Sequence, residues 1–155
     1  MYIFDTSSFI VLGHYFPDVF TSLWEGFDGC VGDGSVVSCR EVYRELDNNN
    51  SSNHLSDWIE ENKSIFLEPT PEELVAVAAF FQDSQYRNLI RSKQVLKGTP
   101  VADPFIIAAA QLKEATVVTQ ESFKPNAARI PTLCKELGIR CIDLQGFMLD
   151  QGWRF

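Results

Sequence analysis

Short apolar runs alternate with longer amphipathic segments along the whole chain. Four of these runs are brief and rich in β-branched or aromatic residues, as buried strands are: Tyr2–Phe4, Ser35–Ser38, Ala115–Thr119 and Ile139–Leu144. Each is separated from the next by segments whose apolar residues have helical spacing. Because parallel strands are joined by crossover helices, this alternation predicts an α/β fold with a parallel sheet of about four to five strands flanked by helices.

The segments predicted to be helical are Thr6–Tyr15, Asp18–Phe27, Arg40–Leu46, Leu55–Asn62, a helix that starts within Pro69–Glu73 and carries Leu74–Phe81, Gln85–Lys93, Asp103–Lys113 and Ile130–Leu137, with a short helix near the end. Start and stop signals mark two of them clearly. In one of these helices, Pro71 is followed by two acids in the first turn. The other has Pro131 in its first turn and Gly138 directly after its end. The glycine-rich stretch 29–34 predicts a turn, and the polar tract Asp47–Asn53 predicts a break between helices.

The composition is that of one folded domain. With 155 residues, 45% of them hydrophobic, the chain is long enough to bury a core as a single unit over residues 1–155. Its apolar runs are far shorter than the ~20 residues of a membrane span. The start of the chain has no basic segment ahead of an apolar one, as a signal peptide would. A cytoplasmic protein with no membrane partner is therefore expected.

The chain contains four cysteines, all in apolar surroundings: Cys30, Cys39, Cys134 and Cys141. They form no C-x-x-C pair and have no histidine cluster nearby, which disfavours a zinc site. Reduced thiols that pack as small hydrophobic side chains are expected. A disulfide between Cys134 and Cys141 is the alternative.

Charge is distributed unevenly along the chain. The net charge of −8 disfavours strong nonspecific binding to nucleic acid. Residues 1–86 hold 3 basic and 15 acidic side chains, whereas residues 87–155 hold 10 basic and 6 acidic ones. Four basic residues follow one another with no acid between them: Arg87, Arg91, Lys93 and Lys97. They form either a solvated helix face or a patch that contacts phosphates.

Four acids lie after a predicted strand or at the start of a predicted helix: Asp5, Glu45, Asp103 and Glu121. Each has an ordinary structural explanation. Asp5 and Asp103 are suited to capping a helix, a helix glutamate such as Glu45 is usually solvated, and Glu121 could be a loop acid. Glu41 lies one turn before Glu45 on the same helix face, so which of the two faces a site is left open.

Taken together, these acids suggest a metal site. The carboxyl ends of parallel strands meet at one edge of a sheet, which is where ligands bind in open α/β folds. Carboxylates gathered there repel one another unless protons or cations neutralise them. Mg²⁺ and Mn²⁺ prefer oxygen ligands, and such ions can activate water for phosphodiester hydrolysis.

Other types of site have less support in the sequence. The only histidines are His14 and His54, so a histidine-based triad or zinc centre has few ligands to draw on. Glycine-rich phosphate loops are absent. An aspartyl-phosphate phosphatase would need a second acid two residues after Asp5, where Ser7 stands.

Four motifs resemble those of the PIN-domain ribonucleases, a family that includes the VapC-type toxins of bacterial toxin–antitoxin pairs. Phe4–Ser7 resembles the family's opening strand with its Asp-Thr/Ser-Ser/Asn signature, and Val42–Leu46 resembles its V-x-x-E-L helix. Ala102–Ala110 is similar to its A-D-x-x-I-A-A-x-A helix and is the most specific match. Val117–Glu121 resembles its L-x-T-x-D strand end. A less characterised PIN-like subfamily is suggested by Val118–Glu121, Ile130–Cys134 and Gly152–Phe155.

This resemblance implies a PIN-like fold and an Mg²⁺- or Mn²⁺-dependent nuclease, a hydrolase that cleaves RNA. By position, Asp5, Glu45 and Asp103 would be catalytic metal ligands together with Glu121, which replaces the usual aspartate. Ser7 and Thr119 would support the pocket. RNA would be held by Arg87, Arg91, Lys93 and Lys97, with Arg44 and Arg40 as weaker candidates.

The resemblance also implies an antitoxin partner and a homodimer. The aromatic residues between 9 and 27 could serve an interface, although the core is the simpler place for them. Because Glu121 departs from the family pattern, a catalytically weak or inactive PIN-like binding module is the alternative function. A flap-cleaving DNA nuclease is a third, for which the chain is short.

Overall fold

The strand that opens the chain, β1 (Tyr2–Phe4), lies at the centre of a parallel sheet. The computed structural model describes residues 1–48, 53–83, 102–125, 127 and 129–154. Its five strands have the order β3-β2-β1-β4-β5, and every neighbouring pair is parallel. The other strands are β2 (Val36–Cys39), β3 (Phe66–Leu67), β4 (Thr116–Val118) and β5 (Cys141–Ile142). The predicted α/β class with a parallel sheet is therefore confirmed.

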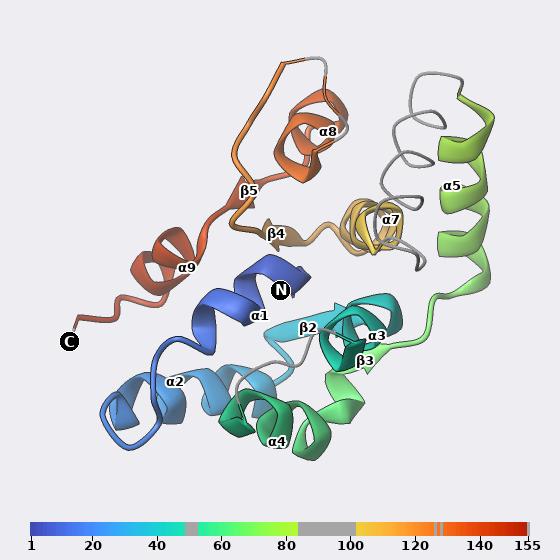
Figure 1. The fold of residues 1–155 in the computed structure, drawn as a ribbon. Coiled ribbons are helices and arrows are strands. Elements are labelled where there is room, and N and C mark those ends of the chain that lie inside the picture. Colours follow the sequence, from blue (N-terminus) through green and yellow to red (C-terminus); the bar gives the residue numbers. More distant parts are fainter. Residues whose placement is uncertain (49–52, 84–101, 126, 128, 155) are drawn as a thin grey trace.

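Helices cover both faces of the sheet (Figure 1). The described helices are α1 (Thr6–Leu12), α2 (Thr21–Gly32), α3 (Arg40–Asn48), α4 (Asn53–Glu61), α5 (Pro71–Gln82), α7 (Asp103–Lys113), α8 (Ile130–Leu137) and α9 (Leu144–Asp150), with a 3-10 turn η1 (Lys63–Ile65). Helix α7 packs on β1, β2 and β4, and α5 packs on α7. Among the described residues, no helix is long and apolar enough to cross a bilayer.

Alternation along β1 places its side chains on opposite faces of the sheet. The ring of Phe4 contacts Phe9 of α1, Phe27 of α2 and Phe147 of α9, so these three helices share one face. All four rings are fully buried. The aromatic core on this face ties the two ends of the chain to the central strand.

Several predicted elements have the bounds that the sequence indicates. Strand β1 and helices α7 and α8 match their predicted ranges, and Gly138 ends α8 in the left-handed conformation at φ 68°. Helix α5 begins with a capping box, in which the Thr70 hydroxyl accepts from the Glu73 amide and the Glu73 carboxylate accepts from the Thr70 amide.

The predicted boundaries of the first two helices are wrong. Helix α1 ends at Leu12, and a Cβ at the next residue, Gly13, would lie 2.8 Å from Leu55 Cδ2. Helix α2 begins at Thr21 rather than at residue 18, and it continues beyond Phe27 into the predicted glycine turn, as far as Gly32. Burial of Phe27 and Cys30 on one side of α2 outweighs the low helix propensity of its glycines, and the turn comes only at Gly34.

The fifth strand has no counterpart in the sequence pattern. Strand β3 has two residues, too few to show any periodicity, and it is defined by its pairing with Ser38 and Cys39 of β2.

The predicted basic helix Gln85–Lys93 lies outside the described residues. All four cysteines are free thiols, so Cys134 and Cys141 do not form a disulfide.

The aromatic residues of the first two helices divide between core and surface. Phe9 and Trp24 are buried, as a core role requires, and Tyr15 is partly buried. Phe16 and Phe20 are exposed, in the loop that leads into α2. The expectation of a core role is therefore wrong for these two.

Candidate active site

The candidate site lies at the edge of the sheet where the parallel strands end. Asp5 directly follows β1, and its backbone amide still donates to Val118 O of β4. It is also the N-cap of α1, because its carboxylate accepts from the Ser8 amide at 2.8 Å. Asp5 thus caps α1 and also lies at the edge of the sheet where the strands end.

The Asp5 carboxylate is buried, with 4% of the residue exposed, among hydroxyl and amide donors. Thr119 Oγ1 donates to Oδ2 at 2.6 Å, and Ser7 Oγ lies 2.9 Å from Oδ1 and 2.7 Å from Oδ2. Ser7 has a single hydroxyl proton, so these contacts and the Ser8 amide supply three protons for about four lone-pair positions. The carboxylate therefore keeps capacity for one further electropositive partner.

Burial shifts the pKa of this group. Desolvation raises the pKa of Asp5 above its ordinary value, although the hydrogen bonds from Thr119, Ser7 and Ser8 act in the opposite direction. Within the described residues, Asp5 forms no ion pair with a lysine or arginine. A buried carboxylate without a cation is costly when ionised, and this cost is what a bound divalent ion would offset.

Glu45 is bonded to Thr6, the residue that follows Asp5. It lies on α3, which follows β2, and it is buried. The Thr6 hydroxyl donates to its Oε2, and the Ala102 backbone amide donates to its Oε1 at 3.1 Å. Glu45 therefore links the residue after Asp5 to the residue before Asp103.

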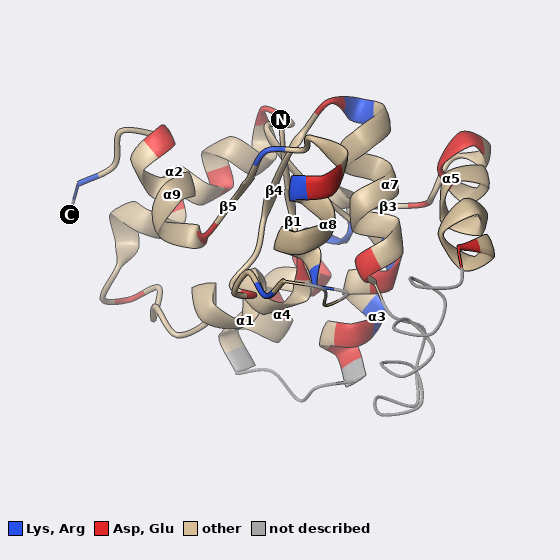
Figure 2. Ribbon diagram, turned by 90° about the horizontal axis from the view of Figure 1, so that it is seen from above, with Lys and Arg blue, Asp and Glu red and all other residues tan. Residues whose placement is uncertain are grey.

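Asp103 is the first residue of α7 and is half-buried. The N-cap of that helix is Ala102, which has no capping side chain, so the expectation that Asp103 caps the helix is wrong. Its position in the first turn lets the helix dipole stabilise the carboxylate. Helix α3 and the start of α7 are neighbours in both views (Figure 1, Figure 2).

Glu121 lies in the segment that leaves β4 and is half-buried. Its backbone amide donates to Thr119 Oγ1 at 3.0 Å, which in turn donates to Asp5. Its Oε2 accepts from the Ile130 amide at 2.9 Å. Helix α8 has no side-chain cap of its own, so Glu121 satisfies one of its free amides. Glu121 thus has a structural contact as well as a position near Asp5.

Hydrogen bonds through Thr119 connect Asp5 to Glu121, and Glu45 is bonded to the chain neighbours of Asp5 and Asp103, which are Thr6 and Ala102. Ser7 extends the network by accepting from the Gln120 amide at 2.9 Å. Even so, among the residues that the structure describes, no three Asp, Glu, His or Cys side chains are grouped so that they could hold a metal ion. In this arrangement the four carboxylates do not form a common ligand set.

Glu41 is buried more deeply than Glu45, with 2% of the residue exposed. Its Oε1 is paired with Arg40 at 2.8 Å and lies 3.7 Å from Arg44, while its Oε2 is buried without a hydrogen bond. Glu45, rather than Glu41, is therefore the member of this pair that contacts Thr6 and Ala102. Of the predicted RNA-binding residues, Arg44 lies in this ion pair, and Arg87, Arg91, Lys93 and Lys97 lie outside the described residues.

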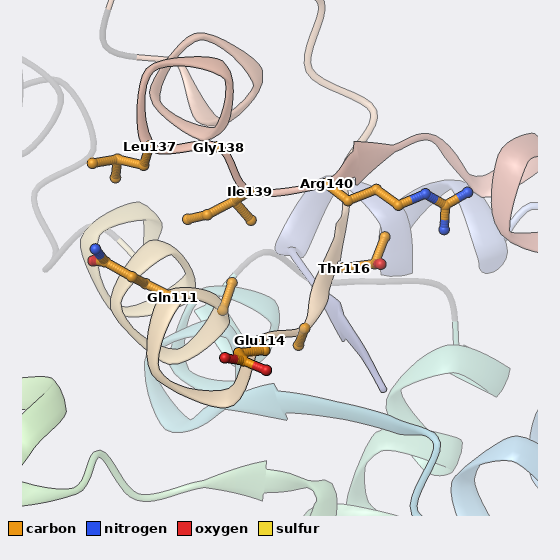
Figure 3. Close-up of a pocket in the computed structure, with 9 residues that line it drawn as sticks. Gln111, Glu114, Thr116, Leu137, Gly138, Ile139 and Arg140 are labelled. Atoms are coloured by element: carbon orange, nitrogen blue, oxygen red, sulfur yellow. The ribbon is translucent and has the colours of Figure 1, made fainter.

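A cavity of about 320 Å³ lies elsewhere, at the opposite ends of the strands (Figure 3). It is lined by residues such as Glu114 at the end of α7, Thr116 at the start of β4 and Arg140 just before β5. None of the four acids of the sheet edge lines it. The acidic edge and this cavity are therefore separate features.

Two contacts of the site are not indicated by the sequence: the Thr6 hydroxyl on Glu45 and the Ala102 amide on the same carboxylate. The sequence does hold a hint of the first contact. Residues 6–8 all carry hydroxyl groups, and the cap at Asp5 does not need all three, so one is available for another partner. No local signal marks the Ala102 amide, because its contact spans 57 positions in the chain.

Comparisons with known proteins identify the family of the chain and do not name an activity. The family described as "Domain of unknown function (DUF4411)" matches residues 2–155. No curated protein matches the chain. A similar solved structure is described as "Crystal structure of PAE2754 from Pyrobaculum aerophilum". It is 14% identical, covers 88% of this chain and 96% of that chain, and has a TM-score of 0.41. A similarity of this size carries no argument about function.

Proposed function

The chain belongs to the DUF4411 family, and we propose that it is a metal-dependent endoribonuclease. One observation supports this most: Asp5 is a buried carboxylate with capacity for a further electropositive partner and no ion pair among the described residues. The resemblance of four motifs to those of PIN-domain ribonucleases supports it independently.

Asp5, Glu45, Asp103 and Glu121 would hold Mg²⁺ or Mn²⁺, since all four offer the oxygen ligands that these ions prefer. When bound, such an ion lowers the pKa of a water and stabilises the leaving oxygen of a phosphodiester. The protein's own part is positioning. Ser7 and Thr119 orient the Asp5 carboxylate, and Thr6 orients Glu45. A role as the toxin of a toxin–antitoxin pair rests on the family resemblance alone.

Cleavage of single-stranded RNA with Mg²⁺ or Mn²⁺ tests the proposal. Asp5→Asn and Asp103→Asn should each lower the rate by about 100-fold or more, because each removes a ligand charge. Glu68→Gln is the matched control: this acid is 70% exposed, pairs with Arg40 and should leave the rate unchanged. Cleavage that survives both aspartate substitutions would contradict the proposal. Single-stranded DNA is tested beside the RNA, because cleavage of the DNA alone would indicate a DNA nuclease.

A second function, a PIN-like binding module with a weak or inactive site, is favoured by the Glu121 carboxylate. Its Oε2 accepts from the Ile130 amide, so it is engaged in holding α8. Titration of the protein with Mn²⁺ in a calorimeter distinguishes the two. No heat of binding at millimolar metal, together with no cleavage, would favour the binding module.

A further inference from the structure

The loop between β4 and α8 presents an exposed aromatic ring beside the candidate site. Phe123 is 48% exposed and lies two residues after Glu121. At the length of an extended chain, the two Cα atoms are at most about 7 Å apart. A single exposed aromatic residue is common on protein surfaces and by itself indicates nothing. Its surroundings give this one more weight.

Hydrogen bonds hold the loop on both sides of Phe123. Arg129 donates to the Ser122 carbonyl at 3.3 Å and to its hydroxyl at 2.9 Å. On the other side, the Thr132 hydroxyl donates to Lys124 O at 2.8 Å. The residues on either side of the ring are therefore held by hydrogen bonds, which reduces the conformational entropy that would be lost when a ligand covers it.

A lysine lies over the ring, and two further basic residues belong to the same loop. Lys135 Nζ lies 4.8 Å from its centroid, in cation–π geometry. Lys124 is exposed beside it, and Arg129 is half-buried at the far side of the loop. The ring and Lys135 also line a cavity of about 340 Å³, together with Pro125, Thr132 and Glu136. An aromatic platform among cations is the combination by which proteins bind single-stranded nucleic acid.

We propose that Phe123 stacks on a base of single-stranded RNA, through the ring face that Lys135 does not cover, while Lys135 and Lys124 contact its phosphates. The proposal rests on the proposed function for its choice of RNA, because the loop continues directly from Glu121. It names a substrate subsite that is distinct from the four carboxylates.

Binding is measured separately from cleavage, by fluorescence anisotropy of a labelled short oligoadenylate in EDTA. Phe123→Ala should weaken binding about five-fold or more, the effect of losing one stacked base, and Phe123→Trp should retain it. Phe16→Ala is the matched control, since Phe16 is 59% exposed on the α1–α2 loop. An abasic oligomer of the same length should bind wild type and Phe123→Ala equally. Lys135→Gln should reduce the slope of log K against log salt by about 0.7.

Several outcomes would overturn the proposal: no binding by the wild-type protein, equal binding by Phe123→Ala, or an equal loss with the abasic oligomer. Loss of self-association by Phe123→Ala without loss of RNA binding would make the loop a protein contact instead. Thermal unfolding checks that each variant is folded. Cleavage without any effect of Phe123→Ala would leave the proposed function standing, whereas Phe123-dependent binding without cleavage would remove the nuclease and keep the subsite.

Discussion

Asp5 combines a structural contact with a candidate chemical one. It caps α1 through the Ser8 amide, yet it is buried where ionisation is unfavourable. The hydroxyls of Ser7 and Thr119 reduce that cost without removing it, because burial still raises the pKa of Asp5. Among single residues, this conflict between local capping and burial of charge is the clearest sign of a functional site.

Asp5→Asn should change how stability depends on pH. Because the pKa of Asp5 is raised in the folded state, the unfolded chain ionises first as the pH rises from about 3.8. Ionisation of Asp5 therefore lowers the free energy of unfolding of the wild-type protein until the pH passes the pKa of Asp5 in the folded state. Asp5→Asn lacks this ionisation and should not show the loss. Relative to wild type, the variant's free energy of unfolding should rise over that window and then level off, as measured by urea denaturation without divalent metal. A difference between the two proteins that is independent of pH would contradict this.

Within the helices, glycine has opposite effects at two positions. Gly29 lies within α2 with open space around its Cα, whereas Gly138 ends α8 at φ 68°. A side chain is favourable in the first setting and strained in the second. The sequence pattern predicts a turn or a helix end at both glycines, and this prediction is correct only for α8.

Gly29→Ala and Gly138→Ala should therefore shift stability in opposite directions. We expect Gly29→Ala to raise the free energy of unfolding by about 0.5–1 kcal/mol, because alanine has the higher helix propensity. Gly138→Ala should lower it by about 1 kcal/mol, because alanine disfavours the left-handed conformation. Urea denaturation of both variants measures the two shifts, and shifts of the same sign would contradict the assignment.

Across the molecule as a whole, the last helix completes the core around the first strand. Phe147 of α9 packs edge-on against Phe4 and Tyr2 of β1, and Trp153 packs on Phe147. The Tyr2 hydroxyl also donates to Asp150 at 3.1 Å. The C-terminal segment is therefore part of the same core as the strand that carries Asp5.

Phe147→Ala should lower the free energy of unfolding by about 3–5 kcal/mol, because it leaves a cavity in the aromatic core. Leu149→Ala is the matched control on the same helix. Leu149 is 64% exposed, and its substitution should change stability by no more than about 0.5 kcal/mol. Similar effects of the two substitutions in urea denaturation would mean that α9 is not part of the cooperative core.

Local signals in the chain are enough to predict the α/β class, strand β1 and the bounds of α7 and α8, because proline in a first turn and glycine after a helix act on their own neighbours. The folded arrangement is needed for the strand order, the two-residue strand β3 and the choice of Glu45 over Glu41 as the partner of Thr6. These features depend on contacts between residues far apart in the chain. Such contacts form only when packing brings the elements together, and no local pattern encodes them.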